Sequence, residues 1–223
     1  MKINNWNIKK INSTNSTNKT IKKMNPLTVL YTLDQKKGYG KNESTWISKK
    51  GDLCFSIKFS KINNLDLLIP LSLIYSIKDF GYSGLVKWPN DIIIDNRKCM
   101  GILFEKEYIK NTCINEIVGI GINIIEKKSI INYSYSLQRL KNKEWLFLKS
   151  FLNYLDKLSF LSREELINEI NKYVYMKYKE VVYDKKYFII IGFDISGKLL
   201  LKEKYSNRFI KINDSYFMND YKL

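Results

Sequence analysis

The feature that most constrains the fold is a crowded series of strand-like segments in the middle of the chain. The segments LVKW, DIIID and CMGILFE (85–105) are rich in β-formers, and only short polar turns at Pro89-Asn90 and Asn96-Arg97 separate them, so we expect adjacent strands joined by tight reversals. INEIVGIGINI (114–124) is apolar almost throughout, which is typical of a central strand that is covered on both faces. A chain with this region must build a sheet and cover it.

The remaining segments supply further strands, helices and a small terminal module. Strands are predicted at 27–35 and 53–59, and polar stretches at 36–52 and 108–116 (YIKNTCINE) are predicted to be loops. Amphipathic patterns predict helices at 13–23, 63–81, 144–158 and 162–176, the last opening with a capping box of Ser162 and Glu165. From residue 187 the pattern changes to strand, turn, strand, turn, strand. We therefore expect a mixed α+β domain over 1–180 and a small β domain over 181–223.

Composition excludes several classes of function. The formal net charge is +16, but lysine is spread along the whole chain and arginine is scarce, which argues against a nucleic-acid partner. The chain has no histidine, so catalytic triads and histidine-ligated metals are excluded, and no metal site is expected. The three cysteines form no CxxC pair and are expected to be buried thiols in a reducing cytoplasm. We find no secretory signal and no apolar stretch long enough for a membrane span.

Three short motifs are weak signals when each is considered alone. The Gly38-Tyr39-Gly40-Lys41 loop offers backbone N–H groups to an anion, but it lacks the features of a P-loop. GIGIN (119–123) lacks the third glycine of a dinucleotide fingerprint. Lys87 and Lys98 mark the ends of a predicted hairpin, whose lysines are either solvated or part of an anion site.

Taken together, the motifs resemble the biotin–protein ligase family along nearly the whole chain. KWPNDIIIDNRKCMGILFE (87–105) is similar to the central signature of that family, and Gln35 followed by GYGKNESTW (38–46) stands where the family has a glutamine and a glycine–arginine-rich loop. GIGINI, Tyr135-Ser136-Leu137 and an STN triplet match further elements. The triplet occurs twice, at Ser13-Thr14-Asn15 and at Ser16-Thr17-Asn18; we prefer the first copy and leave the second open.

The resemblance implies a class II synthetase-like fold with a C-terminal SH3-like module, and a two-step reaction. Biotin and Mg-ATP would give biotinyl-5'-AMP, and the biotinyl group would pass to a lysine of a biotin carrier domain of the acetyl-CoA carboxylase type. Because two anions must meet, cations are needed between them. The family match implies Lys98 and Lys41 as catalytic residues, with Lys98 bridging carboxylate and phosphate.

The resemblance also assigns binding residues. Those implied for biotin are Ser13, Thr14, Asn15, Ser16, Thr17, Asn18, Gln35, Gly38, Tyr39, Gly40, Lys41, Lys98 and Gly101. Those implied for the nucleotide are Trp46, Lys87, Asn90, Asp91 and Asn123. ATP, Mg²⁺ and biotin are expected as substrates, with no tightly bound prosthetic group.

Several departures from the family pattern leave alternatives open. Tyr39 and Lys41 stand where the family loop has arginines, and Glu43 replaces its later glycine, so altered affinity or a catalytically weakened biotin-binding remnant are alternatives. A lipoate–protein ligase shares the fold and the chemistry. The chain begins almost at the STN element, so we expect no N-terminal DNA-binding domain. Members of the family differ in oligomeric state, which leaves a homodimer open.

Overall fold

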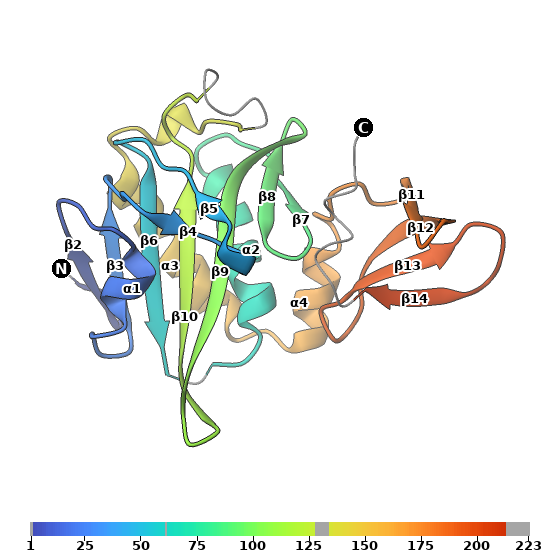
Figure 1. Ribbon diagram of the computed structural model, residues 1–223, viewed down its shortest axis with the longest axis horizontal. Helices are drawn as coiled ribbons and strands as arrows, with labels where there is room; N and C mark the ends of the chain where they lie inside the picture. The colour runs from blue at the N-terminus through green and yellow to red at the C-terminus, as the bar shows by residue number, and fades with distance from the viewer. Residues whose placement is uncertain (1, 61, 128–133, 213–223) are drawn as a thin grey trace.

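The structure is a computed structural model that describes residues 2–60, 62–127 and 134–212. Within these residues the strands form an eight-stranded sheet, a four-stranded sheet and a short two-stranded hairpin. Figure 1 shows the large sheet at the centre, helices behind it, the hairpin crossing in front, and the four-stranded sheet to one side. The predicted α+β architecture, with a mixed sheet and a C-terminal β module, is confirmed.

The large sheet has the strand order β1-β2-β3-β6-β10-β9-β8-β7. β2 and β3 pair in parallel, whereas the other neighbours pair antiparallel. Its strands are β1 (Lys2–Ile3), β2 (Trp6–Lys10), β3 (Thr28–Thr32), β6 (Leu53–Phe59), β7 (Leu85–Lys87), β8 (Asp91–Ile94), β9 (Arg97–Ile109) and β10 (Thr112–Ile122). β10 lies between β6 and β9, so its prediction as a central strand is confirmed.

The two faces of β10 carry different side chains because neighbouring residues of a strand point to opposite faces. Val118, Ile120 and Ile122 belong to the main hydrophobic core. The alternate position Ile117 belongs to a separate small cluster with Ile21. Gly119 and Gly121 share the face of Ile117, so the sheet has a hollow there rather than a layer of side chains.

Helices α2 (Leu65–Lys78) and α3 (Glu144–Leu158) cover the back of the sheet. α2 is buried over most of its circumference, as expected for a helix between a sheet and other helices. Phe151 of α3 meets Phe55 of β6 edge-to-face, with ring centroids 5.4 Å apart. Side chains of this size stabilise the fold by about 1.5–3 kcal/mol each when fully buried.

Several segments differ from their predictions, among them the helix expected over 13–23, which forms only at Thr17–Ile21. The predicted loop 108–116 is the tip of the β9–β10 hairpin, because Lys110 and Asn111 adopt positive φ angles and turn the chain between paired strands. The last predicted helix ends early, as α4 (Arg163–Ile170). Beyond it the chain pairs with β7, where the Val86 N–H donates to Tyr173 O at 2.7 Å. The exposed sheet edge therefore gains a backbone partner, which competes with continued helix.

The C-terminal sheet follows α4. It is antiparallel, with strands β11 (Glu180–Tyr183), β12 (Lys186–Phe193), β13 (Leu199–Glu203) and β14 (Phe209–Ile212). Its β12–β13 turn contacts the large domain, since Trp88 Nε1 donates to Gly197 O at 3.3 Å. The division into domains 1–180 and 181–223 stays a prediction, and 213–223 lie outside the described residues. In the described part of the chain, no helix is both long and apolar enough to span a membrane.

Candidate functional site

The site is built on the glycines of the hollow in the sheet. Gly121 of β10 pairs with Gly101 of β9, and two residues earlier in β10, on the same face, Gly119 pairs with Leu103. A Cβ on Gly119 would lie 2.2 Å from Asn18 Oδ1, and a Cβ on Gly121 would lie 2.2 Å from Trp46 Cε2. The missing side chains therefore make room for Asn18 and Trp46, which lie directly on the backbone of the sheet. The same indole ring also lies close to Gly101, where a Cβ would be 2.7 Å from Trp46 Cζ3.

Neutral polar groups gather at one end of the hollow, where α1 (Thr17–Ile21) begins. Ser16 caps this helix by accepting from the Lys19 N–H. Gln35, just beyond β3, accepts at Oε1 from Thr17 N at 2.9 Å and from Thr17 Oγ1 at 3.2 Å. Ser56 Oγ of β6 lies 2.8 Å from Thr17 Oγ1. The buried hydroxyl groups and the half-buried Gln35 amide are held by one another.

The structure separates the two STN copies. Ser16, Thr17 and Asn18 are buried and line a cavity, whereas Ser13-Thr14-Asn15 precedes the helix and lies outside the lining. Thr14 Oγ1 instead lies 2.8 Å from Thr20 Oγ1. Only the second copy, which begins with the capping residue Ser16, thus lies at the hollow in the sheet. Which copy contacts biotin stays a prediction.

The glycine-bearing segment after Gln35 is a small hairpin, not an irregular loop. It consists of β4 (Gly38–Tyr39), a 3-10 turn (Lys41–Glu43) and β5 (Thr45–Trp46). Gly38 is required by packing, because a Cβ there would lie 2.6 Å from Gln35 Nε2. Gly38 itself is absent from the cavity lining, so it supports the site.

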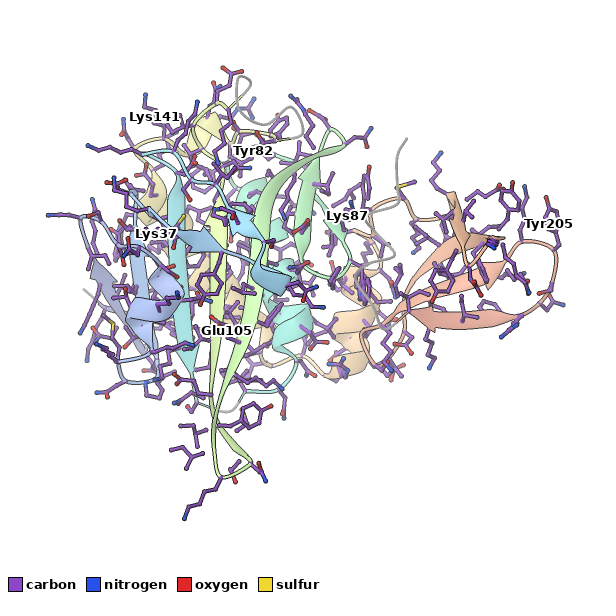
Figure 2. The ribbon with its side chains drawn as sticks, in the orientation of Figure 1. Lys37, Tyr82, Lys87, Glu105, Lys141 and Tyr205 are labelled. Atoms are coloured by element: carbon purple, nitrogen blue, oxygen red, sulfur yellow. The ribbon has the colours of Figure 1, made fainter. Side chains whose placement is uncertain are left out.

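Glu105 of β9 ties this hairpin to the sheet. Its Oε2 accepts from Tyr39 OH at 2.9 Å and from Asn18 Nδ2 at 2.6 Å. Burial raises the pKa of the Tyr39 hydroxyl, and the adjacent carboxylate of Glu105 raises this pKa further. The hydroxyl therefore stays protonated and keeps donating. Figure 2 labels Glu105 on the front of the large sheet.

Lysines gather at the other end of the cavity. Lys98 Nζ lies 2.7 Å from Asp91 Oδ1 and 5.4 Å from the centroid of the Trp46 ring. Burial lowers the pKa of Lys87, and this effect outweighs the opposing influence of Asp91. Lys41 of the 3-10 turn also lines the cavity. Three cations and one carboxylate therefore surround the Trp46 end, which suits a polyanionic ligand.

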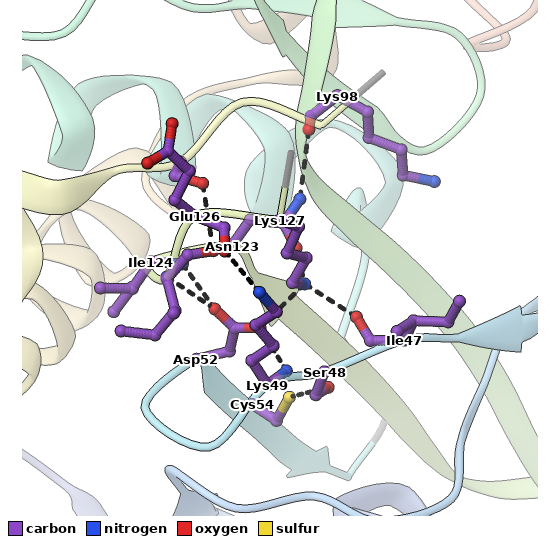
Figure 3. Close-up of polar contacts among 12 residues, drawn as sticks. Ile47, Ser48, Lys49, Asp52, Cys54, Lys98, Asn123, Ile124, Glu126 and Lys127 are labelled. Carbon is purple, nitrogen blue, oxygen red and sulfur yellow. Dashed lines mark hydrogen bonds and ion pairs between the residues drawn. The ribbon is translucent and has the colours of Figure 1, made fainter. Parts of the chain in front are cut away.

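A buried polar cluster around Lys127 is drawn in Figure 3. It lies next to Trp46, whose ring centroid is 5.7 Å from Lys127 Nζ. Lys127 Nζ donates to Asp52 Oδ2 at 2.8 Å, to Ile47 O at 2.8 Å and to Asn123 Oδ1 at 2.5 Å. The side chains of Lys127 and Asp52 are 0% and 1% exposed. Asn123 Nδ2 donates to Lys98 O at 3.2 Å. Asn123 is therefore committed to this cluster and does not line the cavity, in contrast to its implied contact with a nucleotide.

These elements enclose one cavity of about 480 Å³. The site residues from the sequence that line it are Ser16, Thr17, Asn18, Gln35, Tyr39, Gly40, Lys41, Trp46, Lys87, Asn90, Asp91, Lys98 and Gly101. Asn90 also fixes the backbone, because its Nδ2 donates to Ile102 O at 2.7 Å. Ser13, Thr14, Asn15, Gly38 and Asn123 are absent from the lining.

Sequence reasoning missed several supporting residues. Trp88 lines the cavity as part of the KWPND segment, and its place next to Lys87 was a usable signal. Glu105 ends the 87–105 signature, which was a usable signal as well. Ser56 and the Asp52–Lys127 pair gave none, because each acts through a tertiary contact. Among the described residues, no three His, Cys, Asp or Glu side chains gather to hold a metal ion.

Comparison with known proteins identifies relatives of this arrangement. The model of the "Biotin/lipoate A/B protein ligase family" matches residues 8–123, which is 116 of the 223 residues. The bifunctional ligase/repressor BirA of Bacillus subtilis is 32% identical over 105 residues, covering 44% of this chain and 32% of the relative. BirA of Escherichia coli is 28% identical over 195 residues, covering 76% and 60%. The chain thus spans about a third to three fifths of the length of these relatives.

Solved structures extend the similarity to the whole fold. The biotin protein ligase of Aquifex aeolicus, in complex with biotin and ATP, superimposes with a TM-score of 0.70 at 26% identity and covers 93% of this chain and 99% of its own. The biotin protein ligase of Leishmania major, in complex with biotinyl-5-AMP, gives a TM-score of 0.63 at 18% identity, covering 93% and 99%. Because the family model spans more than half of the residues, the chain belongs to the biotin/lipoate A/B protein ligase family, with the fold of its biotin protein ligases.

Proposed function

We propose that this protein is a biotin–protein ligase. In the first step, a carboxylate oxygen of biotin attacks the α-phosphorus of ATP, and pyrophosphate leaves with biotinyl-5'-AMP remaining. In the second step, the ε-amine of a carrier-domain lysine attacks the acyl carbon, AMP leaves with the bonding electrons, and the amine loses a proton. The product is an amide between biotin and the carrier.

The observation that carries this proposal is the division of one cavity into a neutral end and a cationic end. At the neutral end, Thr17 and Gln35 are held in contact at 2.9 Å, and such groups suit an uncharged ureido ring because they donate and accept without a net charge. The lysine end suits a carboxylate and phosphates. A lipoyl group has no ureido donors and acceptors to match these neutral polar groups, which favours biotin over lipoate.

The lysines have separate roles in this proposal. Lys98 stabilises the negative charge that develops between the carboxylate and the α-phosphate, with Lys41 assisting from the hairpin. Lys87 supports the phosphates, and Trp46 offers a flat face to the adenine. Asn90 and Asp91 lie beside the same nucleotide. Lys41 keeps a positive charge where the family loop has arginine but lacks its bidentate geometry, so we expect an altered affinity for the anionic substrates.

Further partners follow from the same chemistry. Mg²⁺ would enter with the phosphates of ATP, because this ion usually keeps several waters and a few carboxylate or phosphate ligands. The carrier is proposed to be a biotin carrier domain of the acetyl-CoA carboxylase type, encountered in the cytoplasm.

The direct test is the intact mass of an apo biotin carrier domain after incubation with the protein, biotin and Mg-ATP. We expect a gain of one biotinyl group, and at least about a hundredfold slower gain with Lys98→Ala if that lysine stabilises the transition state. Lys106→Ala is the matched control, because Lys106 is on the same strand, is 55% exposed and pairs with Glu116 outside the cavity. An equal rate for the two variants would contradict the role of Lys98.

Two other results would replace the proposal. A mass gain only with lipoate and a lipoyl carrier domain would identify a lipoate–protein ligase. No gain with either substrate, combined with biotin binding in calorimetry, would identify a binding remnant with an inactive hairpin.

A further inference from the structure

The Asp52–Lys127 pair is buried, charged and outside the cavity, so it takes no direct part in the proposed chemistry. Lys127 donates to three acceptors, which matches the three donors of an ammonium group. Asp52 accepts from the backbone N–H groups of Lys49, Ile124 and Ile125 at 2.7, 2.8 and 2.9 Å. The Lys127 ammonium and both carboxylate oxygens of Asp52 therefore have hydrogen-bond partners. We call this pair the junction.

The junction joins the two segments that carry Trp46 and Lys98. On one side Lys127 holds Ile47 O, the carbonyl next to Trp46 in the chain. On the other side it holds Asn123, whose amide holds Lys98 O. Lys127 Nζ also lies 5.7 Å from the centroid of the Trp46 ring, on which Lys98 Nζ lies at 5.4 Å. Figure 3 shows Lys127 between these two arms.

We propose that Asp52 and Lys127 are positioning residues that fix the separation of Trp46 and Lys98. This inference rests on the proposed function, in which Trp46 meets the nucleotide and Lys98 meets the reacting anions. A buried ion pair is a poor source of net stability, because desolvation offsets its attraction. The three hydrogen bonds of Lys127, however, fix the positions of Asp52, Ile47 O and Asn123 relative to one another. Apolar side chains of the same size would not fix these positions.

The proposal predicts which property changes when the pair is lost. In Lys127→Met, Ile47 O and Asn123 lose their shared donor. The position of Trp46 at the end of the hairpin is then no longer coupled to the position of Lys98. We expect the KM for ATP to rise at least tenfold and kcat for adenylation to fall, while the Kd for biotin stays within twofold because the Thr17–Gln35 end is untouched. A purely structural defect would reduce the active fraction and leave the KM for ATP unchanged.

A matched control and a second variant separate positioning from folding. Lys58→Met is the control, because Lys58 is also nearly buried at 6% exposure, pairs with Glu107 at 3.0 Å and donates to Lys22 O, yet it lies outside the cavity lining. The double variant Asp52→Asn/Lys127→Met leaves no unpaired charge. We expect it to unfold at a higher temperature than Lys127→Met while keeping the raised KM for ATP.

Amide hydrogen exchange tests the same inference without enzyme activity. We expect residues 38–48 to exchange at least tenfold faster in Lys127→Met and in the double variant than in the native protein or in Lys58→Met. If the native protein shows no ligase activity but Lys127→Met and the double variant still exchange faster than it does, the junction is supported and the proposed function is removed. Unchanged exchange, or recovery of the KM for ATP together with stability in the double variant, would overturn the inference.

Discussion

The glycines of the hollow in the sheet lead to a specific prediction for Gly121→Ala. The φ angle of Gly121 lies outside the left-handed region, so alanine is compatible with the backbone. The added methyl group, however, would lie 2.2, 2.4 and 2.6 Å from Cε2, Nε1 and Cζ2 of Trp46. Ordinary contact begins at 3.4 Å, so the indole must move by about 3.4 − 2.2 = 1.2 Å.

Two opposing effects determine the stability of this variant. Forcing a methyl group into a filled space costs about 1–3 kcal/mol. Replacing glycine in a strand reduces the entropy of the unfolded chain and returns about 0.5–1 kcal/mol. We therefore expect the free energy of unfolding to fall by about 0–2.5 kcal/mol, with a central value of about 1 kcal/mol. We expect a larger effect on activity, because a misplacement of about 1 Å reduces catalysis by about a hundredfold.

A double-mutant cycle in urea unfolding identifies the cause. If the indole is the obstacle, Gly121→Ala in a Trp46→Ala background should be neutral or stabilising by about 0.4–1 kcal/mol. Pyrophosphate release should show a raised KM for ATP in Gly121→Ala. Gly119→Ala is the matched variant on the same face, because its methyl group meets Asn18 Oδ1 at 2.2 Å, and it should weaken biotin binding instead.

The reasoning is refuted if Gly121→Ala destabilises the Trp46→Ala background as much as it destabilises the native protein. It is equally refuted if Gly119→Ala and Gly121→Ala affect biotin and ATP alike. Either result would mean that the glycines do not seat these two side chains separately.

Three further predictions concern ionisable groups. Lys87→Arg should keep ATP binding at alkaline pH where the native protein loses it, because burial lowers the pKa of Lys87 and arginine stays charged. Burial by itself would raise the pKa of Asp194, but the ion pair with Lys211 and nearby hydrogen bonds lower this pKa from 3.8 to about 2. The ionised carboxylate therefore stabilises the fold by about 2 kcal/mol above pH 4, and this stabilisation is lost as the pH falls towards 2. Asp194→Asn should weaken the dependence of the free energy of unfolding on pH in that range. Tyr39→Phe should increase proteolysis of the hairpin by releasing Glu105.

Periodicity was sufficient to predict most strands and helices. The mostly apolar character of 114–124 follows from its place between β6 and β9. The capping box of Ser162 with Glu165 is present at the start of α4, as predicted. The early end of α4 was not predictable from local sequence, because pairing with the β7 edge outweighed helix propensity there.

The residues that line the candidate site were largely predictable from the sequence, but the residues that hold them in place were not. The lysines and the glycines stand in recognisable motifs, whereas the partners that fix them lie far away in the sequence. Asp52 and Lys127 carry no local signal, since each resembles the many other charged residues of this chain. Asn123 was placed in the right region, but its amide and carbonyl are already used by Lys98 O and Lys127.

The duplicated STN triplet provides its own matched control. Thr14→Val and Thr17→Val delete the same hydroxyl at constant volume, and each breaks a native contact, with Thr20 for Thr14 and with Gln35 and Ser56 for Thr17. Only Thr17 of the two lines the cavity, so Thr17→Val should weaken biotin binding about tenfold, because it removes a hydroxyl that could hydrogen-bond the ligand. Thr14→Val should change the Kd for biotin by less than about twofold, because a hydroxyl outside the site contributes only to local stability. Identical sequence in two places would then have two different consequences, and calorimetric titration of both variants with biotin distinguishes them. If both variants weaken biotin binding equally, the first triplet also reaches the ligand. The helix cap at Ser16 would then not determine which triplet contacts biotin.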